Sequence, residues 1–162
     1  MNILALDPAR ITGFAHTNGV GGVIEFSHGD ARLRELEDWL TDKLDEWPTE
    51  LIAFEDAGFG SHNPHVQALH NENRGVIKLI ATRRRIAVRA CNIKSIKKFA
   101  TGNGNAKKEQ MIAAAERHFK IKVTNDNFAD ALWILEFAKQ PQQPTVTKER
   151  KKKSAKKQPK LF

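Results

Sequence analysis

NILALDPARITGFAHTNGVGGVIEF, residues 2–26, decides the fold class because it predicts three short strands in succession. Residues 2–6 form an apolar run that ends at an acid, which is typical of a buried strand. Residues 12–15 and 20–26 are two further strands, and Asn18-Gly19 between them favours a tight hairpin turn. A Gly-Gly pair directly after this turn suggests a bulge. The chain is therefore expected to begin with an antiparallel meander.

The segment that follows alternates helical and strand patterns. Residues 31–47 have the apolar spacing of an amphipathic helix, with Asp30 as its N-cap, and residues 51–54 form a buried strand that ends at Glu55. Further helices are expected at residues 64–84, 94–100, 106–119 and 128–138, with a strand at residues 86–91. This order predicts an α/β protein with three α/β/α layers.

The chain divides into a folded part and a tail. Its 162 residues suit one domain. From Gln140 onward the composition is Gln, Pro, Lys, Thr and Ser without an apolar pattern. We therefore expect a single folded domain at residues 1–140 and a disordered basic tail at residues 141–162.

Cysteine content and hydropathy exclude several protein classes. Cys91 is the only cysteine, which excludes an internal disulfide and a multi-cysteine zinc site and favours a buried apolar role. No apolar run approaches the roughly 20 residues that span a membrane. The first ten residues lack the features of a signal peptide. We expect a cytoplasmic protein.

Charge is distributed unevenly along the chain. Residues 1–73 contain 4 Lys/Arg and 13 Asp/Glu, whereas residues 74–122 contain 14 and 2. The last fifteen residues add 8 basic residues and 1 acidic residue. A basic block within a folded segment, followed by a basic tail, is typical of a protein that binds a polyanion. The alternative is a solvated cationic face without a ligand.

Acidic residues stand where a sheet forms binding crevices. Asp7 and Glu55 each end an apolar strand, and Asp130 lies on the last predicted helix. Carboxylates at one sheet edge suit Mg²⁺, and a two-metal site can activate water for phosphodiester cleavage. Each acid also has a simpler interpretation, as a turn residue, a loop acid or a solvated helix residue.

Four motifs follow one another across residues 3–138, and they are LALDPARITGFA, IAFEDAGFG, IKKFATGNGNAKKEQM and NDNFADALWILEFA. In this order they resemble the motifs of RuvC-type Holliday junction resolvases, and the phage-encoded branch is most similar. The resemblance implies an RNase H-like fold with a five-stranded mixed sheet. It also implies Mg²⁺ or Mn²⁺, two ions per active site, and water as the nucleophile, leaving a 5′-phosphate and a 3′-hydroxyl.

The same resemblance implies four carboxylates at the metal site. Three positions match Asp7, Glu55 and Asp130. Cellular members of the family usually have an acid or His three residues before the last Asp, where this chain has Asn127. Asp126 lies one helical turn from Asp130 and is the preferred fourth ligand, with Asn127 as the alternative. Asp126 could instead serve only as the N-cap of its helix.

Cationic and aromatic residues are expected to contact DNA. The resemblance places Lys108 near the scissile phosphate and implies a second DNA-contacting lysine at Lys97 or Lys98. Lys107 is a further candidate, although a solvated helix face also explains it. Phe59 matches an aromatic wedge directed at the junction centre, and Arg74 belongs to an Arg-Gly pair of the family. His62, His65 and His70 do not form a recognised metal motif, and we expect them at the surface.

The tail has two expected roles. Lysines within residues 148–160 would add salt-sensitive contacts with DNA phosphates. Its last five residues, QPKLF, resemble a bacterial sliding-clamp-binding peptide, which would make Gln158, Leu161 and Phe162 the clamp-binding residues.

The leading interpretation is a homodimeric, metal-dependent endonuclease that resolves four-way DNA junctions in a bacterial or phage-infected cell. Two-fold symmetry would place one active site at each cleavage point, and the helix at residues 64–84 is the expected dimerisation element. The alternatives are a broader branched or flap DNA nuclease, a ribonuclease H, and a non-catalytic DNA-binding module associated with a clamp.

Overall fold

The computed structural model describes residues 1–56 and 63–141. Its five strands form one mixed sheet in the order β3-β2-β1-β4-β5. The strands are β1 (Ile3–Asp7), β2 (Ile11–His16), β3 (Gly21–Glu25), β4 (Leu51–Asp56) and β5 (Ala87–Asn92). The helices are α1 (Ala31–Glu46), α2 (Pro64–Arg84), α3 (Ile93–Thr101), α4 (Lys108–Phe119) and α5 (Asp126–Ala138). The predicted α/β class and five-stranded mixed sheet are confirmed.

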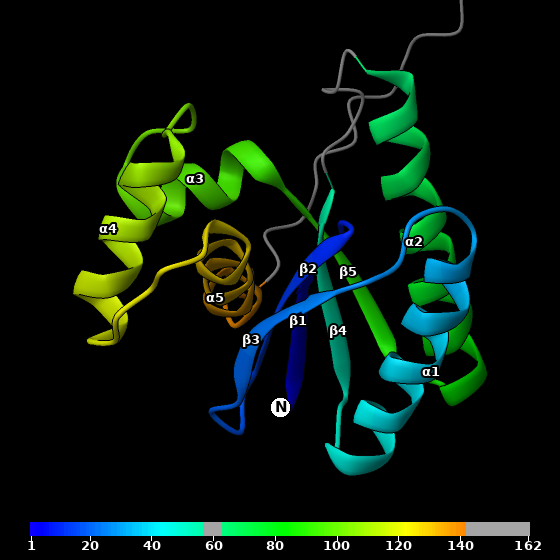
Figure 1. Cartoon of the computed structure of the whole chain (residues 1–162). Coiled ribbons are helices and arrows are strands. Elements are labelled where there is room, and N and C mark those ends of the chain that lie inside the picture. The colour runs from blue at the N-terminus through cyan, green and yellow to red at the C-terminus, as the bar shows by residue number, and fades with distance from the viewer. Residues whose placement is uncertain (57–62, 142–162) are drawn as a thin grey trace, which may run out of the picture.

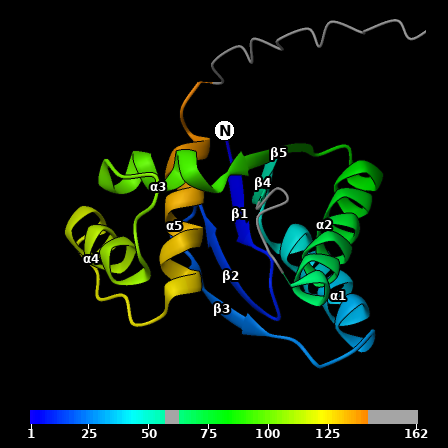
Figure 2. The same ribbon diagram turned by 90° about the horizontal axis from the view of Figure 1, so that it is seen from above.

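Helices cover both faces of this sheet. Helices α1 and α2 lie on one face, while α5 packs on the other with α3 and α4 beside it (Figures 1 and 2). Strand alternation divides the core accordingly. In β1, Leu4 and Leu6 pack towards α1 and α2, whereas Ile3 and Ala5 pack towards α5. Each face of the sheet therefore carries its own hydrophobic core.

Two glycines allow α5 to lie directly on β2 and β3. A Cβ at Gly13 would be 1.9 Å from the carbonyl oxygen of Asn127, and one at Gly21 would be 2.7 Å from the Phe128 ring. The expected bulge is wrong, because Gly21 and Gly22 continue a regular ladder with β2. The absence of a side chain at Gly13 and Gly21 therefore lets the first turn of α5 pack directly against the sheet.

The start of α5 differs from the sequence prediction. Asn125 is the N-cap, and its side chain accepts hydrogen bonds from the N–H groups of Asn127 and Phe128. The helix thus begins at Asp126, two residues before the predicted start. The interpretation of Asp126 as the N-cap is wrong, because the preceding residue takes that position. This leaves the Asp126 carboxylate available for other contacts.

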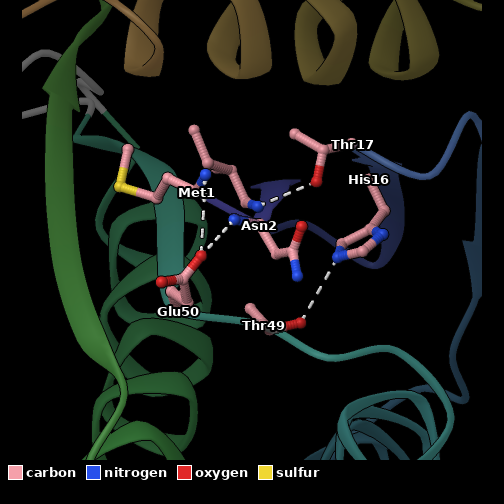
Figure 3. A network of polar contacts seen from close by, with 7 residues as sticks. Met1, Asn2, His16, Thr17, Thr49 and Glu50 are labelled. Carbon is pink, nitrogen blue, oxygen red and sulfur yellow. Dashed lines mark hydrogen bonds and ion pairs between the residues drawn. The ribbon is translucent and has the colours of Figure 1, made fainter.

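Polar contacts close the sheet edge at the start of β1 and β4 (Figure 3). Glu50 accepts the N–H of Asn2 at 2.6 Å, and Thr17 accepts the N–H of Ile3 at 3.1 Å. His16 stacks on Trp47 with ring centroids 5.5 Å apart. The charged groups here, the Met1 ammonium and the Glu50 carboxylate, are exposed and paired with each other. These contacts therefore hold the starts of β1 and β4 and the adjoining loops together.

Other expectations concern burial and the tail. Cys91 is 1% exposed, and burial raises the pKa of its thiol to about 11, so the expected buried apolar role is confirmed. Among the described residues, no helix has the length and apolar character needed to cross a membrane. Most of the expected disordered tail lies outside the described residues.

Candidate active site

Asp7 and Glu55 stand side by side at the carboxyl ends of two parallel strands. Strands β1 and β4 are in register at Ala5 and Ala53, and the same register continues to Leu6 and Phe54. The next residue on each strand is the acid. Because side chains alternate, Asp7 and Glu55 point to the same face as Ala5 and Ala53, which is the face covered by α5.

Helix α5 brings two more carboxylates to this edge. Asp126 and Asp130 are four residues apart and therefore share one side of the helix. Negative charge on Asp130 raises the pKa of both Asp7 and Glu55, and Asp126 raises the pKa of Asp7 and Asp130. The four acids named from the sequence therefore form one electrostatic group.

Burial makes this group costly to ionise. Asp7 is 8% exposed, and burial, followed by repulsion from Glu55, raises its pKa well above the ordinary value. Burial and then Asp130 raise the pKa of Glu55 to about 7, and burial raises that of Asp130 to about 6. Carboxylates held close together in this way favour either protons or a multivalent cation.

Two lysines border the acids. The Lys108 ammonium hydrogen-bonds the Asp126 carboxylate, which lowers the pKa of Asp126 and raises that of Lys108. The Lys108 side chain is nevertheless 76% exposed. Lys97 is partly buried and lowers the pKa of Glu55 and Asp130, so it faces the same group. Lys98 and Lys107 are exposed.

The donor chemistry at this edge suits a hard divalent cation. Carboxylate oxygens are the ligands that Mg²⁺ prefers, and their mutual repulsion would be relieved by positive charge. Within residues 1–56 and 63–141, no group of three or more His, Cys, Asp or Glu side chains is arranged so that it could hold a metal ion by itself. A site that also uses water and substrate oxygens does not need such an arrangement. The residues therefore fit a cation that is shared with substrate.

Other named residues have different surroundings. The Arg74 side chain is only 9% exposed and pairs with Asp56 at 3.5 Å. Its guanidinium also lowers the pKa of Glu55, so it lies close to this acid. Its predicted contact with DNA stays a prediction. Phe59 and His62 lie outside the described residues, as do the tail residues Gln158, Leu161 and Phe162.

Two residues of α2 were missed by the sequence analysis. His70 was expected at the surface, and this is wrong, because it is partly buried and its Nδ1 lies 2.8 Å from the Pro8 carbonyl oxygen. Asn73 is 1% exposed and donates to the Ala9 carbonyl oxygen at 3.3 Å. The buried spacing from Asn73 to Ile77 continues back to His70, and this helical period was the available signal.

Comparisons with known proteins agree with this geometry. Residues 3–135 match the sequence family described as Crossover junction endodeoxyribonuclease RuvC. A protein of that name from Porphyromonas gingivalis is 32% identical over 133 residues, covering 74% of this chain and 69% of the relative. Another from Rhodopirellula baltica is 30% identical over 146 residues, covering 82% of each chain.

Solved structures show the same fold. Thermus thermophilus RuvC in complex with Holliday junction substrate aligns with a TM-score of 0.72 and 21% identity, covering 83% of this chain and 90% of that chain. The yeast mitochondrial Holliday junction resolvase Ydc2 aligns with a TM-score of 0.57 and 13% identity, covering 82% of this chain and 75% of that chain. Given the family match over most of its length, the chain belongs to the RuvC family of crossover junction endodeoxyribonucleases.

Proposed function

We propose that the protein is a metal-dependent endonuclease that resolves four-way DNA junctions by paired phosphodiester hydrolysis. The observation that carries this proposal is the group of four carboxylates from two strand ends and one helix, bordered by Lys97 and Lys108. Family membership supports the reaction class. A Thermus relative is described with Holliday junction substrate, which supports the choice of DNA.

We assign the metal site to Asp7, Glu55, Asp126 and Asp130. Two Mg²⁺ or Mn²⁺ ions bound there would activate water and stabilise the leaving oxygen of an in-line displacement. Asn127 is the weaker candidate, because its side chain offers a single neutral amide oxygen where a carboxylate offers two oxygens and a negative charge. Asp126, in contrast, presents a carboxylate that already binds a cation, the Lys108 ammonium.

The lysines complete the chemistry. Lys108 is exposed enough to exchange Asp126 for a substrate phosphate, where its charge would stabilise the transferring phosphoryl group. Lys97 would limit repulsion between the acids and the incoming backbone. Exposed Lys98 and Lys107 would contact flanking phosphates, and Phe59 would stack on a base at the junction centre. Hydrolysis would leave a 5′-phosphate and a 3′-hydroxyl.

The proposed homodimer would use the outer face of α2. Leu79 on this helix is 49% exposed, and a Cβ at Gly75, one turn before it, would meet open space. On the edge strand β5, Val88 is 37% exposed, and it faces the α2 side because Cys91 packs in the core beneath α5. Exposed apolar side chains next to a small residue suit close packing of two helices.

The tail, residues 141–162, would act apart from the nuclease domain. Its lysines would add salt-sensitive affinity for DNA phosphates. Gln158, Leu161 and Phe162 of its QPKLF segment would bind a sliding clamp.

A cleavage assay tests the proposed activity. Wild type and Asp7→Asn would be incubated with Mg²⁺ or Mn²⁺ and a four-way junction, a flap, a linear duplex or an RNA–DNA hybrid. We expect paired symmetric nicks on the junction that the substitution abolishes. Equal cutting of flaps would instead indicate a general branched-DNA nuclease, and preference for the hybrid would indicate a ribonuclease H. Binding without cutting would contradict any nuclease function.

A further inference from the structure

Side chains on one face of α2 hydrogen-bond the backbone that directly follows β1, the strand that ends at Asp7. His70 Nδ1 lies 2.8 Å from the Pro8 carbonyl oxygen, and a carbonyl only accepts, so this nitrogen carries the proton. Asn73 Nδ2 donates to the Ala9 carbonyl oxygen at 3.3 Å, and Thr12 Oγ1 donates to the same oxygen at 2.7 Å. The carbonyls of both residues that follow Asp7 are therefore fixed by side chains.

The same face of α2 also contacts β4, the strand that carries Glu55. Arg74 pairs with the carboxylate of Asp56 at 3.5 Å, and Asp56 directly follows Glu55 in β4. His70, Asn73 and Arg74 are spaced at i, i+3 and i+4, which places them on one side of the helix. A single rigid helix thus contacts the end of β1 and the end of β4.

We propose that His70, Asn73 and Arg74 are positioning residues that hold Asp7 and Glu55 at the separation needed to bind a metal ion. The proposal rests on the proposed function, because it assigns a metal to these acids. Repulsion between two neighbouring carboxylates favours their separation, and the strand ends would yield to it without a support on the opposite side. Catalytic groups must be held within about 0.5 Å of their working geometry, and contacts of this kind provide that restraint.

His70 offers the sharpest test because only one of its atoms makes the contact. Asn places an N–H close to the position of histidine Nδ1, so His70→Asn retains the donor, whereas His70→Leu removes it. His65 lies on the same helix and is exposed, so His65→Leu is a matched control. The partial burial of His70 makes these substitutions milder than a change at the fully buried Asn73.

The experiment measures Mn²⁺ binding by calorimetry without DNA, together with junction cleavage kinetics and thermal unfolding. We expect His70→Leu to weaken Mn²⁺ binding about tenfold, the lower end of the range for residues that orient metal ligands. The kcat should fall while the KM for the junction stays unchanged. His70→Asn should restore both the affinity and the kcat, and His65→Leu should match wild type.

Other outcomes separate this proposal from the one on which it rests. If His70→Leu lowers only the melting temperature and binds Mn²⁺ as tightly as wild type, the contact is merely structural and the proposal is overturned. Equal loss in His70→Leu and His70→Asn would also overturn it. A wild type that binds Mn²⁺ but cuts no branched DNA would contradict the proposed function, while the affinity comparison would still decide this proposal. A wild type that binds no Mn²⁺ without DNA would overturn this proposal, whereas the proposed function would still be decided by the cleavage assay.

Discussion

Glu50 directly precedes β4 and Glu55 lies near the other end of this strand, and their surroundings differ completely. The Glu50 side chain is 63% exposed and accepts the N–H of Asn2 at 2.6 Å (Figure 3). Glu55 is partly buried beside Asp7 and Asp130, and its pKa is raised to about 7. Arg74 and Lys97 lower that pKa without cancelling the effects of burial and repulsion.

This difference separates stability from function along a single strand. An exposed acid with a backbone partner stabilises the edge where β1 and β4 begin. Repelling acids at the other edge destabilise the native state, and such an arrangement is typical of sites that must bind a ligand. The sheet therefore has one edge that stabilises the fold and one that is prepared for chemistry.

The largest expected difference is between two separate variants in which one of these glutamates is replaced by glutamine. We expect Glu55→Gln to reduce junction cleavage about 1,000-fold, because loss of a metal ligand removes several kcal/mol of transition-state stabilisation. Glu50→Gln should leave cleavage unchanged. Single-turnover rates with Mg²⁺ measure both, and equal losses in the two variants would break the comparison.

A second matched pair tests the lysines at the start of α4. Lys108→Met should reduce the cleavage rate about 100-fold with little change in DNA affinity, because its charge acts on the transferring phosphoryl group. Exposed Lys107 makes no contact with the acids, so Lys107→Met should change the rate less than the salt-dependent affinity. A loss of affinity without a loss of rate at Lys108 would count against its assigned role.

The close packing of α5 predicts a difference between two glycines of the meander. Gly13→Ala would place a methyl group 1.9 Å from the Asn127 carbonyl oxygen, so we expect a loss of about 2–3 kcal/mol in the free energy of unfolding. Gly22 has its nearest neighbours at 3.6 and 3.7 Å, and Gly22→Ala should be tolerated. Urea unfolding of both variants decides the matter, and a stable Gly13→Ala would show that α5 sits less closely.

The raised pKa values predict a pH dependence at the catalytic edge. The pKa of Glu55 rises from 4.5 to about 7 on folding, so between these values the native state keeps a proton that the unfolded chain releases. Stability should therefore fall as pH rises through this window, by an amount on the order of 1–3 kcal/mol. Urea unfolding in EDTA at pH 5 and pH 8 measures the fall. The fall in stability should be smaller in Glu55→Gln than in wild type. An identical pH dependence in both proteins would contradict a raised pKa at Glu55.

Much of this comparison follows from local sequence patterns. The positions of Asp7 and Glu55 at the ends of apolar strands already place both at one edge of the sheet, and helical spacing pairs Asp126 with Asp130. These patterns reflect short-range geometry, which a sequence expresses directly. The same argument gave the five strands and the order of the helices, with boundaries shifted by one or two residues.

The rest depends on contacts between distant segments. His70 contacts Pro8, which lies 62 positions earlier in the sequence, and no local sequence pattern around either residue indicates this contact. The role of Gly21 is set by the Phe128 ring, so local pattern alone suggested a bulge. Asn125 and Asp126 are both favourable caps, and only the packed position of α5 distinguishes them.

Thermal unfolding of wild type and Asp7→Asn, each in EDTA and in Mg²⁺, tests the central claim most directly. In EDTA the variant should melt at a higher temperature than wild type, because the substitution removes one of the repelling carboxylates. Mg²⁺ should then raise the melting temperature of wild type and have much less effect on the variant. A variant that melts lower in EDTA and gains as much from Mg²⁺ as wild type would contradict an edge prepared for metal at the expense of stability.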